Sequence, residues 1–196
     1  MIDSTPIRFI PALYSSSRED ARIDMLVIHY TATATLDECV SIFLDPARRV
    51  SCHYIVDTDG DIVQMVYDED CAWHCGASRW HGRERCNPWS IGIEIVNQGQ
   101  LVRRAENFFG WPGDFTAPYT GPTPVYARRA WWTPYPPAQM ESVFVLSGHL
   151  VERYQIPLDK VVRHSDIAPD RKIDPGPVFP WRRFRTVLSR VASGGR

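Results

Sequence analysis

The sequence lacks a long uninterrupted apolar stretch. No window approaches the roughly 20 apolar residues that a membrane-spanning helix needs. Residues 1–20 also lack the basic leading region and the apolar core of a secretory leader. These absences predict a chain without a membrane span that works in the cytoplasm, or in the periplasm if a leader has been removed.

An excess of charge of either sign is also missing. Lys and Arg number 22 against 23 Asp and Glu, so the formal net charge is −1. Proteins that bind nucleic acids or anionic membrane surfaces through electrostatic attraction usually carry a basic excess. Neither kind of partner is therefore expected.

Cysteine is sparse, with five residues and no C-x-x-C pair. A chain of this length can bury enough apolar surface to fold without disulfides, so reduced thiols are expected. Five residues of zinc-ligand type nevertheless lie close together in the chain: Cys71, His74, Cys75, His81 and Cys86. A structural zinc site there is an alternative, although the spacing matches no common finger or ribbon.

Short stretches rich in apolar and β-branched residues are present, and they predict strands. The clearest are residues 23–31 and 90–96, and residues 160–164 form a shorter one. Within residues 53–66, two β-prone runs flank the turn signal Asp59-Gly60, which is the pattern of a hairpin.

Helical patterns separate these strands. Thr35 and Glu38 match a capping box and predict a helix that ends near Pro46. Apolar residues at helical spacing predict a long helix from about residue 137 to Tyr154 and a closing helix over residues 179–191.

Strands and helices intermixed in this way predict an α/β fold with a mixed central sheet flanked by helices. The length favours a single domain over residues 1–196, with its core at about 23–190. A stretch rich in Pro and Trp, at about residues 100–137, is expected to be an irregular insertion.

Three predicted strands each carry one ionisable residue where apolar residues are expected: His29, Glu94 and His164. Catalytic zinc takes three protein ligands and leaves one position for water. Two imidazoles and one carboxylate satisfy that count and leave net positive charge on the ion, so it stays a strong Lewis acid.

The loop HSDIAPDRKIDPGP, residues 164–177, supplies more carboxylates. Its three prolines make continuous helix or central strand improbable and favour a defined loop. The third ligand could be Glu94 or one of Asp166, Asp170 and Asp174, and spacing alone does not choose between them.

Six motifs, taken in chain order, resemble a known family: VIHYT, SCHYIVDTDG, AWHCG, GRERCN, SIGIEI and HSDIAPDRKIDPGPVFPW. They are similar to the zinc-dependent N-acetylmuramoyl-L-alanine amidases of the AmpD and AmiD type, over about residues 23–185. That amidase-2 family shares its fold with T7-lysozyme-like phage amidases and peptidoglycan recognition proteins.

The resemblance implies one Zn²⁺ per chain, held by His29, His164 and Asp174. It also implies that Glu94 is the catalytic glutamate and Lys172 the catalytic lysine.

Further matches to the family are in its binding groove. Arg85 matches an arginine that meets a carboxylate of the stem peptide, and Trp73 and His74 match groove residues. His53 lies in a strand motif where the family has no ligand, so a structural role is expected for it.

The implied reaction is hydrolysis of the amide between N-acetylmuramic acid, or its 1,6-anhydro form, and the L-alanine of the stem peptide. The implied partner is a muropeptide or peptidoglycan, and a monomer is expected. GRERCN is AmpD-like, whereas VIHYTA and the insertion are AmiD-like, so the preference between anhydro-muropeptide and intact peptidoglycan stays open. The alternative function is a non-catalytic peptidoglycan-binding protein of the same fold.

Overall fold

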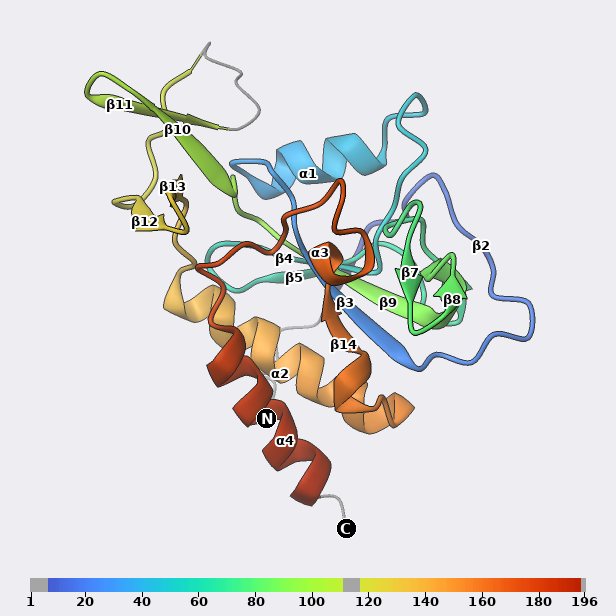
Figure 1. Ribbon diagram of the computed structural model, residues 1–196. Coiled ribbons are helices and arrows are strands. Elements are labelled where there is room, and N and C mark those ends of the chain that lie inside the picture. The colour runs from blue at the N-terminus through green and yellow to red at the C-terminus, as the bar shows by residue number, and fades with distance from the viewer. Residues whose placement is uncertain (1–6, 111–116, 195–196) are drawn as a thin grey trace.

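The computed structural model describes residues 7–110 and 117–194. Its centre is a six-stranded sheet in the order β1-β5-β4-β9-β3-β14 (Figure 1). The strands, in sheet order, are β1 (Arg8–Phe9), β5 (Ile62–Gln64), β4 (Tyr54–Val56), β9 (Ser90–Ile95), β3 (Met25–Tyr30) and β14 (Val161–Arg163). Strands β4, β9, β3 and β14 pair in parallel, and β5 pairs antiparallel with β4. This arrangement confirms the predicted α/β class and the hairpin at residues 53–66.

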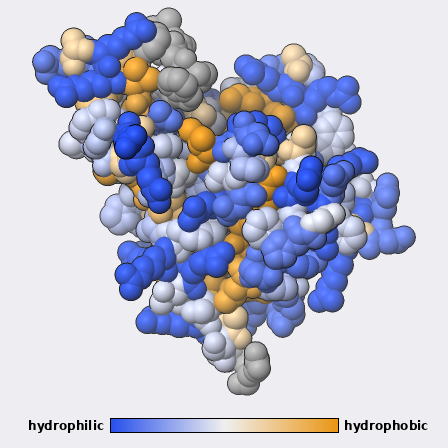
Figure 2. Space-filling model, in the orientation of Figure 1, coloured by the Kyte–Doolittle hydropathy of each residue, from blue (hydrophilic) through white to orange (hydrophobic). Residues whose placement is uncertain are grey.

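Two helices cover one face of the sheet: α2 (Pro137–Tyr154) and α4 (Trp181–Gly194) lie side by side there (Figure 1). Alternate residues of β3 and β9 point into this layer, among them Leu26, Ile28 and Ile93, and all three are fully buried. The apolar sides of both helices are thereby removed from water. The face of the molecule in Figure 2 is mainly hydrophilic, with smaller hydrophobic areas.

The opposite face of the sheet carries shorter elements. They are α1 (Leu36–Phe43), α3 (His164–Ile167), the strands β2 (Ser16–Ser17), β6 (Asp70–Cys71), β7 (Arg79–Trp80) and β8 (Arg83–Glu84), and the 3₁₀ turn η1 (Asn87–Trp89). A second 3₁₀ turn, η2 (Leu158–Lys160), precedes β14 and contacts α4. Helix α1 begins with the predicted capping box: Thr35 Oγ1 accepts the Glu38 N–H, and Glu38 accepts the Thr35 N–H in return. All five cysteines are free and buried, as expected for reduced thiols.

The prediction of irregular structure over residues 100–137 is wrong for much of that stretch. It contains a four-stranded antiparallel sheet, made of β10 (Gln100–Arg104), β11 (Asn107–Gly110), β12 (Val125–Ala127) and β13 (Ala130–Trp132). The β12–β13 turn holds Arg128 and Arg129 at φ 51° and 64°. Hairpin turns of that geometry favour Asn-Gly, so an Arg-Arg pair gives no recognisable turn signal.

Two end points also differ from expectation. Strand β14 stops at Arg163, and His164 begins the short helix α3, where a loop without helix was expected. Asp166 Oδ2 accepts the Arg163 N–H at 2.9 Å, which closes this helical turn before the first proline of the loop.

Among the described helices, none combines the length and apolar character needed to cross a membrane.

Candidate active site

Three ionisable side chains form one row, two of them on neighbouring parallel strands and the third directly after β14. His29 of β3 is the register partner of Glu94 of β9. On the other side of β3, Arg163 pairs with Ile28, so His164 follows at the level of His29. Paired residues of parallel strands project to the same face of the sheet, so all three reach the face opposite α2 and α4.

Asp174 joins the two histidines. The Nδ1 atoms of His29 and His164 are 2.8 Å apart, and Asp174 Oδ2 lies 3.2 Å and 3.0 Å from them respectively. Among the described residues, these three form the group of possible metal ligands whose donor atoms converge. The cysteine-rich segment 71–86 contributes no such group in the described part of the chain.

The structure separates the candidate carboxylates that spacing left open. Asp166 closes the turn of α3, and Asp170 lines a different pocket. Asp174 alone among the three loop aspartates is held against the histidines. Its own backbone C=O accepts the Ser165 N–H at 3.1 Å, so the loop returns to its starting point.

The protonation states in this cluster are those that metal ligands require. Burial, with the neighbouring His164, lowers the pKa of His29 to about 4. Burial alone would raise the pKa of Asp174, but the adjacent imidazoles of His164 and His29 outweigh it and hold that pKa below its usual range. Near neutral pH His29 is therefore a neutral imidazole and Asp174 an ionised carboxylate.

Glu94 borders this cluster without joining it. Its Oε1 lies 3.9 Å from His29 Nδ1, and its Oε2 is buried without a hydrogen-bond partner. Burial, together with the nearby charge of Asp174, raises the pKa of Glu94 well above its ordinary value. The side chain keeps 13% exposure, so Glu94 can exchange a proton with a molecule in the cleft.

A cleft of about 550 Å³ opens over the cluster. Besides the four residues above, its lining includes Trp73, His74 and Lys172. Lys172 and Asp174 thus reach the same cleft from one short segment of the loop. The cleft therefore brings together side chains that can contact a substrate, the carboxylate of Glu94, which can carry a proton, and the ammonium group of Lys172.

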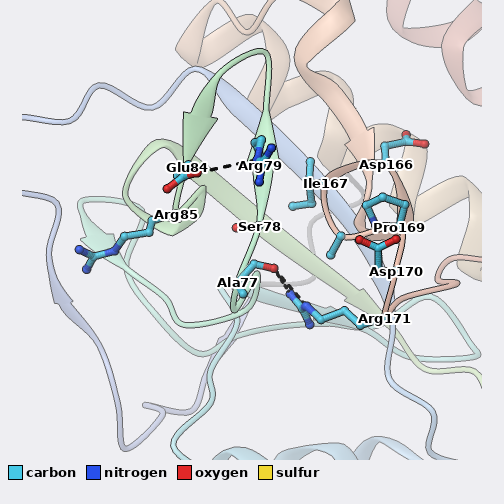
Figure 3. Close-up of a pocket in the computed structure, with 11 residues that line it drawn as sticks. Ala77, Ser78, Arg79, Glu84, Arg85, Asp166, Ile167, Pro169, Asp170 and Arg171 are labelled. Atoms are coloured by element: carbon cyan, nitrogen blue, oxygen red, sulfur yellow. Dashed lines mark hydrogen bonds and ion pairs between the residues drawn. The ribbon is translucent and has the colours of Figure 1, made fainter.

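Arg85 lies elsewhere. It is exposed and lines a neighbouring pocket of about 600 Å³, together with Asp166 and Asp170. Figure 3 shows Arg85 following β8 on one side of this pocket and the two aspartates on the other. The role implied for Arg85 stays a prediction.

Arg171 was not identified from the sequence, although it lines both pockets. Its guanidinium donates to the backbone carbonyl of Cys75. It also donates to the backbone carbonyl of Ala77 (Figure 3). These bonds tie the acidic loop to the segment that follows His74. The only signal for it in the sequence was its position in the quoted loop motif.

His53 lies outside the converging cluster. It is fully buried, and its Nδ1 accepts the Gly92 N–H at 3.0 Å. Burial and the adjacent Arg18 lower the pKa of His53 to about 3. Its hydrogen bond supports the backbone of β9, in keeping with the expected structural role.

Comparison with known proteins gives a consistent result. A family model described as N-acetylmuramoyl-L-alanine amidase matches residues 19–177. The chain is 37% identical over 170 residues to N-acetylmuramoyl-L-alanine amidase AmiD of Escherichia coli, covering 83% of this chain and 52% of AmiD. It is 32% identical over 200 residues to 1,6-anhydro-N-acetylmuramyl-L-alanine amidase AmpD of Enterobacter cloacae, covering 93% and 90% respectively.

A solved structure is also similar. The complex of E. coli AmiD with anhydro-N-acetylmuramic acid-L-Ala-D-γ-Glu-L-Lys superposes with a TM-score of 0.66 at 34% identity. The match covers 91% of this chain and 60% of that one. The chain therefore spans about half the length of the AmiD sequence that it matches.

Proposed function

Because the chain belongs to the N-acetylmuramoyl-L-alanine amidase family, we propose that it hydrolyses the amide bond between N-acetylmuramic acid, or its 1,6-anhydro form, and the L-alanine of a stem peptide. The observation that carries this proposal is the convergence of His29, His164 and Asp174 beside Glu94 in one cleft. The non-catalytic alternative requires only a groove, whereas a buried proton carrier beside a ligand triad supports a hydrolase.

The donor atoms of the triad fit a zinc ion. His164 Nε2 donates to the Cys75 carbonyl at 3.1 Å, so a neutral His164 directs the lone pair of Nδ1 toward His29 and Asp174. Electron-rich atoms held this close repel one another unless a cation lies among them. Two imidazole nitrogens and one carboxylate oxygen form a donor set used by catalytic zinc. When bound, zinc supplies a Lewis acid that polarises a carbonyl and acidifies water.

The chain's own residues then divide the work. Glu94 takes a proton from the attacking water and delivers it to the leaving amine of L-alanine, and its raised pKa favours the delivery. Lys172 brings positive charge to the cleft, where it stabilises the oxyanion of the tetrahedral intermediate. Trp73 supplies an aromatic wall of the cleft. Its ring stacks on that of Tyr14, with the ring centroids 5.3 Å apart.

The proposal is tested with two substrates: an anhydro-muropeptide and intact peptidoglycan sacculi. Mass analysis of the products is expected to show a free stem peptide with an N-terminal L-alanine and the matching peptide-free glycan. The ratio of the two rates defines the substrate preference that the sequence left open. Tight binding of either substrate without product would refute hydrolysis and support the non-catalytic alternative.

Metal content is the second expected result. The purified protein should hold one zinc per chain, and a chelator should remove both the zinc and the activity, because the triad is the converging ligand group in the described residues. Elemental analysis with activity measurements checks this. As a control, Cys71→Ser with Cys86→Ser should retain the zinc, and its loss there would revive a structural site in segment 71–86.

A further inference from the structure

We propose that His74 is a positioning residue that fixes the tautomer of His29, and that residues 74 and 75 together brace both histidine ligands of the metal. This inference rests on the proposed function for the presence of zinc. It differs from the groove role implied by the sequence, because it assigns the imidazole of His74 to His29 and not to substrate.

A chain of hydrogen bonds assigns the protons. The Ser90 hydroxyl donates to the Cys86 carbonyl at 2.9 Å, so its oxygen lone pairs are available to His74 Nε2 at 3.2 Å. His74 therefore carries its proton on Nε2, and in a neutral ring its Nδ1 is an acceptor. His29 Nε2 lies 2.9 Å from that atom and donates to it.

The consequence falls on the other nitrogen of His29. A neutral imidazole with its proton on Nε2 has a bare Nδ1. That Nδ1 is the atom directed at His164 and Asp174. The series of hydrogen bonds that starts at Ser90 thus leaves a lone pair on His29 Nδ1 directed at the metal position. The other tautomer of His29 would place a proton on that atom.

The ring of His74 is held rigidly. A Cβ added at Gly92 would lie 2.5 Å from its Cγ and Nδ1, so the ring packs directly on the backbone of β9. The N–H groups of His74 and Cys75 both donate to Asn87 Oδ1, at 3.2 Å and 2.7 Å. A side chain fixed at both its backbone and its ring can hold a ligand in one orientation.

The same segment reaches the second histidine. His164 Nε2 donates to the Cys75 carbonyl at 3.1 Å. Two adjacent residues therefore orient the two imidazole ligands, one through a side chain and one through the backbone. Partners of this kind commonly change metal affinity by about 10–100-fold when they are removed.

The experiment compares zinc affinity in His74→Leu and His74→Asn. Leu fills the space without an acceptor, and Asn can offer its Oδ1 close to the position of Nδ1. We expect the dissociation constant for zinc, measured by competition with a chromophoric chelator, to rise about 10–100-fold in His74→Leu and to recover largely in His74→Asn. Trp73→Leu, a cleft variant next to it, should leave zinc affinity unchanged.

A measurement on the wild-type protein guards against a variant that fails to fold. In the zinc-loaded protein, ¹H–¹⁵N correlations of the histidine rings should place the protons of His29, His74 and His164 on Nε2. A proton on Nδ1 of His74, or wild-type zinc affinity in His74→Leu with a raised KM, would overturn the inference. Zinc binding without turnover in the wild type would refute the proposed function alone.

Discussion

Glu94→Gln is expected to abolish hydrolysis, with kcat lower by about 10²–10⁴-fold, while the fold and the zinc content stay as in the wild type. Gln keeps the size of the side chain but cannot accept the proton of water or carry it to the leaving amine. The carboxylate lies beside His29 without belonging to the converging triad, so its loss should not release the metal. Turnover of a muropeptide, elemental analysis and circular dichroism check the three parts.

The matched control is Glu84→Gln. Glu84 undergoes the same chemical change, but it is exposed and lies outside the cleft, where it forms a surface ion pair with Arg79. Its kcat should stay at the wild-type value, because exposed pairs contribute little. Loss of zinc from Glu94→Gln would identify Glu94 as a ligand and reopen the role of Asp174.

The second large effect separates two neighbours in the acidic loop. Asp174→Ala is expected to lose zinc and activity together, because it removes one of three converging donors and the partner of both histidines. Lys172→Ala is expected to keep its zinc and to lose about 10²–10³-fold in kcat, the usual effect of removing one oxyanion donor. Metal analysis and steady-state kinetics on both variants distinguish these outcomes.

Asp170→Ala is the control for this pair. It removes a carboxylate from the same loop, but Asp170 lines the neighbouring pocket and not the cleft. Its zinc content should therefore match that of the wild type. Full zinc occupancy in Asp174→Ala, or wild-type turnover in Lys172→Ala, would show that the loop has been misinterpreted.

Local patterns in the sequence were sufficient for the main elements. The capping box of Thr35 and Glu38, the Asp59-Gly60 turn and the spacing of α2 depend on residues only a few positions apart, so the printed order of residues determines them. His29, Glu94 and His164 were also identifiable, because an ionisable residue in an apolar strand breaks a simple pattern.

Which side chains meet was decided only by the tertiary structure. The identity of the third metal ligand depends on the backbone contact between Ser165 and Asp174, which returns the loop to its start. Spacing in the sequence cannot distinguish the three aspartates of the loop. The small sheet of the insertion depends on pairing between strands whose Arg128-Arg129 turn has no sequence signature.

The placement of His74 is the clearest case of this division. The motif AWHCG indicated a groove residue. The ring of His74 instead packs on Gly92 and forms a hydrogen bond with His29, which is 45 positions earlier in the chain. The sequence by itself determined the strands, the helices and the types of residue that do the chemistry. The tertiary structure decided which of those residues meet. It did so through the register between parallel strands, the close approach of a side chain to a glycine and the closure of a loop. Such contacts join segments that are distant in the sequence, so they leave no local pattern.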